Sequence, residues 1–327
     1  MDKDTIKRLI IEYQQFVANI TLIEREIHLS HQLNYVFVGL RRAGKSYLMY
    51  QQIQSLLNDG HQPEEILYFN FEDDRLVNLT VEDLDLIKVS YEELYPHKPI
   101  FFLDEIQIVE HWENFARRLA DQQYRVYITG SNAKMLSAEI ATTLGGRYIV
   151  QNVYPFSFSE FLKASKIEIG PTWYYKNRTE IVRTFSDYFS YGGLPELMLI
   201  ETIEKRQWLS NLFNKIFFGD LITRYSIRND LAMKVLIRKL AESVKQPSSF
   251  NRLTNIVSTT GAKVSTDTII DYLNFLQATW LFFSLENYAS KLVEKISNRK
   301  YYFIDNGLLN LFLIDPVSYT HLTLPTT

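Results

Sequence analysis

The sequence has no cysteine among its 327 residues. The absence excludes a disulfide framework, a cysteine-ligated zinc or iron–sulfur site, and a thiol nucleophile. The sequence also has no large excess of positive or negative charge, because 35 basic and 38 acidic side chains leave a net charge of -3. No global basic field therefore directs the molecule to nucleic acid or to an anionic membrane, and any such contact must come from a local patch.

Long apolar runs are missing as well. The longest lie around residues 35–40, 100–103 and 280–283, far short of the roughly 20 residues that a transmembrane helix needs. The N-terminus begins Met-Asp-Lys-Asp and lacks the basic start and apolar core of a signal peptide. We therefore predict no membrane partner and a cytoplasmic location.

The order of the apolar segments predicts an α/β fold. Short runs rich in aromatic and β-branched residues, typical of buried parallel strands, lie at 35–39, 66–71, 100–104 and 125–130. Helical patterns separate these runs at 45–58, 81–94 and 112–122. This alternation predicts a parallel sheet with helices on both faces. It stops after Tyr148, and the following residues are largely helical to about Tyr225.

A glycine-bracketed loop follows the first predicted strand. Residues 39–46 match G-x-x-x-x-G-K-[ST] in full and open a predicted helix. The glycines let backbone N–H groups turn toward phosphates, and the helix N-terminus favours negative charge. Lys45 is predicted to reach the β and γ phosphates of ATP, and Ser46 to ligate Mg²⁺. The predicted nucleotide-binding residues are Gly39, Leu40, Arg41, Arg42, Ala43, Gly44, Lys45 and Ser46.

Two adjacent carboxylates end the third predicted strand. Asp104 and Glu105 follow an apolar run and lie 59 residues beyond Lys45, from 104 minus 45. The pattern resembles a Walker B strand, in which Asp104 holds the Mg²⁺ shell and Glu105 orients and deprotonates the attacking water. An acidic pair after a strand is by itself usually a solvated strand end. The P-loop upstream makes the catalytic interpretation the favoured one.

The fourth predicted strand ends in small polar residues. Ser131 is the candidate for the sensor-1 group that faces the γ-phosphate, with Thr129 and Asn132 behind it. A turn followed by a helix N-cap at Ser131 or Asn132 explains the same residues equally well.

Arg147 follows two glycines and is a candidate arginine finger. It would act on the γ-phosphate of a neighbouring subunit or of its own chain. A surface arginine after a turn is the commoner explanation. The acidic run at 72–74 after the second strand is interpreted as solvated.

Six motifs occur in a fixed order along the chain. They are the P-loop, Asp104-Glu105, 129–131, Gly146-Arg147, 154–161 and 191–196. In this order they resemble the bacterial and archaeal AAA-like ATPases fused to a C-terminal domain of uncharacterised function, over about residues 27–313. The resemblance implies an ATPase core, a helical lid and a winged helix, usually followed by a restriction-endonuclease-like domain that is absent here. Ser46 stands where many relatives carry threonine, and either hydroxyl can bind magnesium.

The predicted domain organisation follows from the motifs and the resemblance. We expect an N-terminal helical segment at 1–30, an AAA-like ATPase domain at 31–153, a helical lid or linker at 154–228 and a truncated winged-helix-like domain at 229–316. Residues 317–327 look like a translated transposon-end adapter from sequencing-library preparation. We therefore expect the natural polypeptide to continue beyond about residue 316.

The predicted winged helix raises the question of a partner. Its reading helix at 266–277 carries Asp267, Asp271 and Asn274 and no arginine or lysine, which argues against phosphate contacts and major-groove readout. DNA is therefore the weaker prediction, and a protein partner through this region is the alternative. A basic cluster could touch a DNA backbone, although a solvated loop is the commoner explanation; its members are Lys291, Lys295, Arg299 and Lys300.

Three functional hypotheses stay open. The first is a Mg²⁺-dependent ATPase that moves its helical and winged-helix parts, the second a slowly hydrolysing nucleotide-gated switch, and the third a DNA-acting protein of a mobile element or defence system. Other enzyme classes lack support, because the sequence has no H-E-x-x-H zinc motif and no G-x-S-x-G elbow. ATP is favoured over GTP because no Asn-Lys-x-Asp motif is present. The sequence leaves the oligomeric state open.

Overall fold

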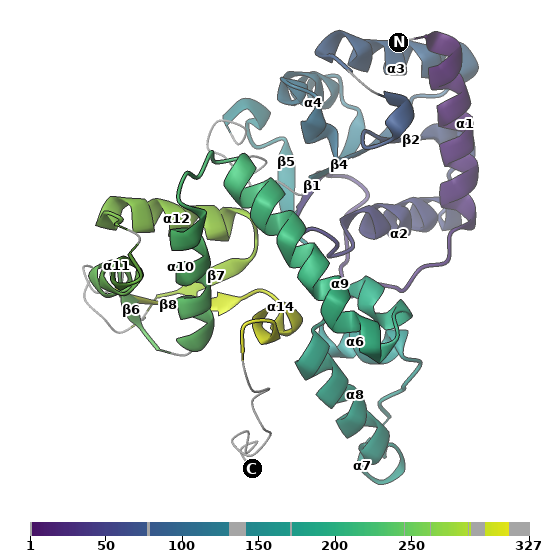
Figure 1. Cartoon of the computed structure of the whole chain (residues 1–327). Helices are drawn as coiled ribbons and strands as arrows, with labels where there is room; N and C mark the ends of the chain where they lie inside the picture. The colour runs from purple at the N-terminus through teal and green to yellow at the C-terminus, as the bar shows by residue number, and fades with distance from the viewer. Residues whose placement is uncertain are drawn as a thin grey trace. The chain divides into compact units, whose positions relative to one another are not determined.

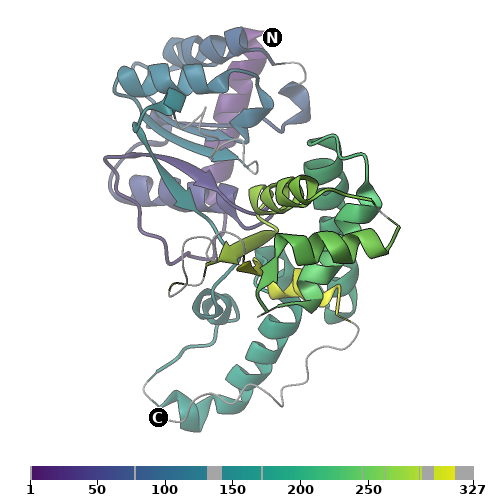
Figure 2. The same ribbon diagram turned by 90° about the vertical axis from the view of Figure 1, so that its left-hand side faces the viewer.

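The computed structural model describes residues 2–76, 79–130, 142–170, 172–244, 246–261, 263–286, 288 and 298–313. These residues form two compact units, Met1–Tyr154 and Pro155–Thr327 (Figures 1 and 2). Each unit contains a sheet of its own. Within the described ranges, no helix combines the length and the apolar character that crossing a bilayer requires.

The first unit is built on a parallel sheet of five strands in the order β2-β3-β4-β1-β5. The predicted α/β fold is thereby confirmed. The strands are β1 (Asn34–Val38), β2 (Ile66–Asn70), β3 (Ile100–Asp104), β4 (Arg125–Gly130) and β5 (Tyr148–Asn152). Because all the strands are parallel, the segments that follow β1, β3 and β4 leave the sheet at the same edge.

Strand β5 is an addition to the predicted pattern, which we expected to stop after Tyr148. It pairs with β1 on one side and forms the edge of the sheet. Ile149 and Val150 are 45% and 48% exposed. The strand combines the β-branched residues Ile149 and Val150 with the polar residues Gln151 and Asn152, so no continuous apolar run extends through it.

Helices cover both faces of this sheet. Helix α2 lies on one face, whereas α3 and α4 lie on the other (Figures 1 and 2). Right-handed crossovers require this arrangement, because the chain passes from β1 to the far edge at β2 and then returns strand by strand. The helices of the unit are α1 (Lys3–Asn19), α2 (Lys45–Asn58), α3 (Val81–Leu94) and α4 (Trp112–Asp121), with short 3₁₀ turns at Pro63–Glu65, Asp74–Leu76 and Ile106–Ile108.

The sheet core is aromatic, and helix α1 protects one edge. The rings of Phe102 and Tyr127 stack with centroids 4.6 Å apart, and Tyr35 stacks on Tyr127 at 5.9 Å. The Gln14 side chain of α1 donates a hydrogen bond of 2.8 Å to the Ile66 carbonyl of the edge strand β2. This bond satisfies a backbone acceptor that a neighbouring strand would otherwise occupy.

The second unit is mainly helical. Its helices are α6 (Phe158–Ala164), α7 (Trp173–Lys176), α8 (Arg178–Tyr191), α9 (Thr202–Lys215), α10 (Asp230–Glu242), α11 (Phe250–Thr259), α12 (Thr266–Ala278) and α14 (Asn306–Asn310), with a 3₁₀ turn at Pro195–Leu199 and a π-helix at Ile216–Thr223. The small antiparallel sheet has the order β6-β8-β7. Its strands are β6 (Ser248–Ser249), β7 (Phe282–Leu285) and β8 (Asn298–Phe303).

A buried carboxylate explains the double glycine of the motif at 191–196. Asp305 accepts hydrogen bonds from the backbone N–H groups of Gly193 at 2.8 Å, Gly307 at 2.9 Å and Leu308 at 3.3 Å. A Cβ at Gly192, whose φ is +83°, would collide with this carboxylate. Burial raises the pKa of Asp305 to about 6, although the three N–H donors act in the opposite direction.

The raised pKa makes the stability of the protein depend on pH. Between the ordinary carboxyl pKa of 3.8 and about 6, the native state binds a proton that the unfolded state has released. This contribution is therefore complete below the unfolded pKa and is lost as pH rises through about 6. Relative to Asp305→Asn, the free energy of unfolding of the wild type should increase by roughly 2 kcal/mol from pH 7 to pH 4, at about 1.4 kcal/mol per pKa unit. Denaturant titrations of both proteins at several pH values measure this difference, and a constant difference would contradict the assignment.

Candidate functional site

The loop at 39–44 connects β1 to α2 through a backbone path that needs glycine at both ends. A Cβ at Gly39 would collide with the carbonyl oxygen of Val153. Gly44 caps α2 in the left-handed conformation, with φ 94° and ψ 27°, which glycine adopts without strain. Ala43 closes the turn by donating its N–H to the Leu40 carbonyl at 3.1 Å. The glycines of the predicted motif therefore have a steric role in the structure.

Lys45 begins helix α2 and is buried, with 5% of its surface exposed. Its ammonium group donates hydrogen bonds to the loop carbonyls of Gly39 at 3.3 Å and Leu40 at 3.1 Å. Burial lowers the pKa of Lys45, whereas the nearby carboxylates of Glu105 and Asp104 act to raise it. The loop thus encloses a cation whose neighbours include the predicted acidic pair.

Asp104 ends β3 and accepts hydrogen bonds from three hydroxyl groups. Ser46 donates at 3.1 Å, Tyr68 donates at 2.7 Å, and Thr129 donates to the same oxygen as Ser46. Burial raises the pKa of Asp104, and the hydroxyl donors act against that shift. Burial also raises the pKa of Tyr68 well above its usual value, so Tyr68 remains a donor. Strands β2, β3 and β4 and helix α2 therefore all contribute to one polar cluster.

Glu105 follows Asp104 and turns the chain sharply out of the sheet. Its backbone is left-handed, with φ 56° and ψ 36°, which is uncommon for a residue other than glycine. The N–H of Glu105 donates to the Thr129 hydroxyl at 2.9 Å, and its carboxylate accepts a hydrogen bond from the Gln107 amide. Thr129 consequently fixes both members of the acidic pair, since its hydroxyl accepts from one residue and donates to the other.

The structure brings together most of the predicted site residues. Ser46 and Asp104 are in direct contact, Lys45 lies in the same loop, and Arg41 lies 3.8 Å from Glu72. Glu72 is half exposed, and it also forms an ion pair with the P-loop through Arg41. Ser131 lies outside the described residues, as do Asn132, Lys291, Lys295 and the segment 317–327.

Arg147 lies at the amino ends of the parallel strands, whereas the P-loop lies at their carboxyl ends. It precedes β5, whose first residue is paired with Asn34 at the start of β1, whereas the P-loop follows Val38. At about 3.3 Å per residue the two ends are roughly 13 Å apart, which exceeds the reach of an arginine side chain. Arg147 instead forms an ion pair with Asp121 of α4. This position is that of the surface arginine offered as the alternative, and a finger on the phosphate of its own chain or of a neighbouring subunit stays a prediction.

The polar cluster contains one residue that was not predicted and one that was a secondary candidate. Tyr68 was counted only as an apolar member of a buried strand, and Thr129 was placed behind Ser131. A single sequence contains no signal that a strand tyrosine directs its hydroxyl at a carboxylate. For Thr129, the sequence did contain a signal, because a polar residue near the carboxyl end of a predicted strand can face the same site as Asp104.

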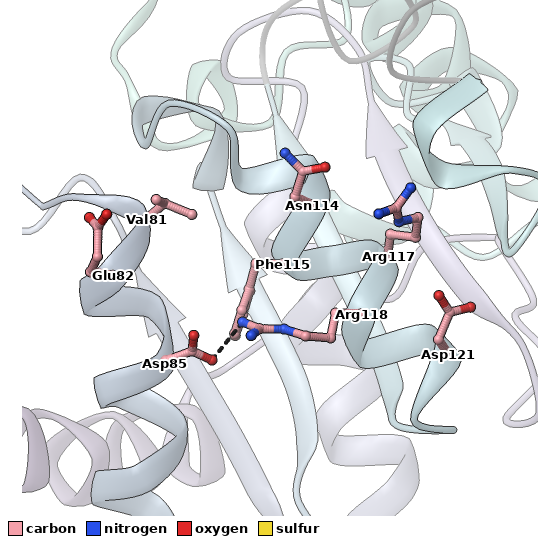
Figure 3. A pocket seen from close by; sticks show the side chains of 8 residues that line it. All are labelled: Val81, Glu82, Asp85, Asn114, Phe115, Arg117, Arg118 and Asp121. Carbon is pink, nitrogen blue, oxygen red and sulfur yellow. Dashed lines mark hydrogen bonds and ion pairs between the residues drawn. The ribbon is translucent and has the colours of Figure 1, made fainter.

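A cavity of about 490 Å³ lies between α3 and α4 (Figure 3). Its lining includes Asp85 and Arg118, which point toward one another and form an ion pair of 2.6 Å. None of the predicted site residues lines it. No cluster of three or more histidine, aspartate or glutamate side chains suited to a metal occurs in the part of the chain that is described. The P-loop edge of the sheet is therefore the candidate site.

Comparisons with known proteins place the chain among similar proteins. Residues 32–162 match the AAA domain family, and residues 182–316 match a domain of unknown function, DUF8612. The chain is 33% identical to the uncharacterized protein MJ1544 of Methanocaldococcus jannaschii over 95% of this chain and 69% of that protein. It is 32% identical to an uncharacterized protein of Haemophilus influenzae over 88% of this chain and 72% of that protein.

A solved structure has a similar fold. The Walker-type ATPase of Pyrococcus abyssi aligns over 95% of both chains with a TM-score of 0.50 and 11% identity. At this identity the likeness concerns the fold alone.

Proposed function

We propose that this chain, which belongs to the AAA-domain family of the uncharacterized archaeal and bacterial proteins named above, binds ATP with Mg²⁺ and hydrolyses it. The observation that carries the proposal is the 3.1 Å contact between the Ser46 hydroxyl and the Asp104 carboxylate. These residues are 58 positions apart in the sequence, and they meet beside the buried ammonium group of Lys45. An ordinary glycine turn would not require this combination.

The donor set suits the proposed ligands. Mg²⁺ prefers oxygen ligands, and the Ser46 and Asp104 side chains supply two of them at one point. The loop at 39–44 offers backbone N–H groups at the start of a 14-residue helix, a combination that favours phosphate. Ser46 and Asp104 would hold Mg²⁺, which would neutralise negative charge on the phosphate groups.

Each protein group has a separate proposed role. Lys45 exchanges the carbonyls of Gly39 and Leu40 for phosphate oxygens, which are stronger acceptors because they are charged. Glu105 orients the attacking water and accepts its proton. Thr129 positions Asp104 and Glu105, and we propose it as the described member of the sensor-1 strand end. Ser131 remains a proposed contributor.

We also propose that hydrolysis moves the second unit, with residues 154–228 acting as a helical lid and 229–316 as a winged helix. The order of α10, β6, α11, α12 and the antiparallel pair β7 and β8 supports the winged-helix proposal. Asp267 and Asp271 are exposed on α12, so repulsion from phosphates opposes DNA readout by this helix. A protein partner is therefore the favoured proposal.

Phosphate release from ATP tests the proposed activity. With Mg²⁺ the protein should release phosphate continuously, and excess EDTA should reduce the rate to background, because without the cation the negative charge of the triphosphate is not neutralised and lies close to the Asp104 carboxylate. Adding Mg²⁺ back in excess should restore the rate. Equal rates with Mg²⁺ and with EDTA would be incompatible with the proposed site.

A further inference from the structure

Arg25 connects the P-loop to the last residues of the first unit. It lies between α1 and β1 and is buried, with 6% of its surface exposed. Its guanidinium donates one hydrogen bond of 3.0 Å to the Ala43 carbonyl in the P-loop and another of 2.8 Å to the Tyr154 carbonyl. A single planar group thus holds two segments that are 111 residues apart, from 154 minus 43.

The backbone of Arg25 is itself fixed to helix α2. Its N–H donates to the side-chain oxygen of Gln51 at 2.7 Å, and its carbonyl accepts from the Gln51 amide at 3.2 Å. Helix α2 begins at the end of the P-loop. The origin of the Arg25 side chain is therefore held in place relative to the loop that it contacts.

The segment at 153–154 also contacts the beginning of the P-loop. The N–H of Val153 donates to the Val38 carbonyl at 2.7 Å. The Val153 carbonyl occupies the space that a Cβ of Gly39 would need. Residues 153–154 are consequently bound to the start of the loop directly and to its end through Arg25. The chain leaves the first unit immediately after Tyr154.

We propose that Arg25 is a positioning residue that transmits the nucleotide state of the P-loop to the segment 153–154, through which the chain enters the second unit. The proposal rests on the proposed function, because it requires a nucleotide in the loop. A guanidinium presents its donors in a rigid fork. A shift of the Ala43 carbonyl upon phosphate binding therefore moves the whole guanidinium group, including the N–H that donates to the Tyr154 carbonyl. A buried guanidinium donor that loses its carbonyl acceptor costs free energy. Arg25 therefore keeps both hydrogen bonds, and a movement of Ala43 is coupled to a movement of Tyr154.

Hydrogen exchange on the full chain tests this proposal. The probe is the non-hydrolysable ATP analogue AMPPNP with Mg²⁺, and two peptides are followed, one covering the P-loop at 39–50 and one covering 150–157. In the wild type, AMPPNP should slow exchange several-fold in both peptides. In Arg25→Lys, which keeps the charge but lacks the fork, the P-loop peptide should remain protected and the nucleotide effect at 150–157 should be lost.

Two further variants separate coupling from stability. Arg8→Lys changes an exposed arginine of α1 and should leave both nucleotide effects unchanged. Arg25→Met keeps the apolar stem and removes both hydrogen bonds, so it should abolish the effect at 150–157 as Arg25→Lys does. A purely structural role would lower the unfolding temperature without AMPPNP and leave the nucleotide effect at 150–157 intact.

The outcomes separate a failure of the proposed function from a failure of the role of Arg25. Absence of AMPPNP protection at 39–50 in the wild type would overturn the proposed function and the role of Arg25 with it. Protection at 39–50 together with an equal nucleotide effect at 150–157 in the wild type and in Arg25→Lys would overturn the role of Arg25 alone. No nucleotide effect at 150–157 in a wild type that is protected at 39–50 would do the same.

Discussion

Replacing Glu105 with glutamine should reduce ATP hydrolysis by about 100-fold or more, because a general base contributes on the order of 10² to 10⁴ to a rate. The amide has the shape of the carboxylate but cannot accept the proton of the attacking water. The backbone bond from Glu105 to Thr129 does not depend on the side chain, so the left-handed turn should persist. Phosphate release at saturating ATP measures the rate, and a fluorescent ATP analogue measures binding, which should be retained.

The control for this variant is Glu110→Gln. Glu110 is exposed and lies a few residues further along the chain, outside the acidic pair. Its replacement makes the same chemical change and should leave hydrolysis and binding at wild-type values. Unchanged turnover in Glu105→Gln would remove Glu105 from the chemistry. Loss of ATP binding in that variant would show a binding role in place of a catalytic one.

Replacing Lys45 with methionine should abolish stabilisation of the protein by ATP. A ligand at a hundred times its dissociation constant stabilises the folded state by about 2.7 kcal/mol, and the variant should gain none of this. Methionine retains the length and apolar stem of the buried side chain but cannot contact phosphate. Because methionine fills the space of the buried lysine stem, the nucleotide-free protein should remain folded. Thermal unfolding with and without Mg-ATP measures both quantities.

Lys98→Met is the matched control for that experiment. The ammonium group of Lys98 also donates to two backbone carbonyls, those of Gln122 at 3.0 Å and Gln123 at 2.9 Å. Lys98 is exposed and precedes β3, so it lies at the amino ends of the strands, whereas the P-loop lies at their carboxyl ends. Its replacement should leave the effect of ATP intact. Full stabilisation of Lys45→Met by ATP would contradict phosphate binding by Lys45.

The four buried strands of the first unit could be predicted because each is a short, continuous apolar run. Strand β5 was not predicted, although Ile149 and Val150 are β-branched residues that favour strands, because the polar residues Gln151 and Asn152 follow them and end the apolar run. Its place beside β1 depends on pairing with a strand more than a hundred residues earlier. The same pairing puts Arg147 at the amino end of the sheet, a position that the sequence alone did not indicate.

The double glycine at 192–193 shows the same limit in the second unit. The sequence showed it only as part of a motif and did not indicate its buried partner, because Asp305 is 112 residues away from Gly193. Two of the three donors, Gly307 and Leu308, belong to the helix that Asp305 caps, which is a local feature. The contact with Gly193 comes from a distant segment, and no local pattern around Asp305 indicated it.

The P-loop and the acidic pair after β3 were determined by the sequence alone, because glycine placement, the helix start and a strand end are local features of a few consecutive residues. The tertiary structure decided which side chains complete the cluster. Tyr68 and Thr129 join Asp104 only because β2 and β4 flank β3 in the sheet, and Arg25 reaches Ala43 and Tyr154 only because the chain folds back along α2. Such contacts depend on strand order and packing, which bring together residues that no spacing in the sequence relates.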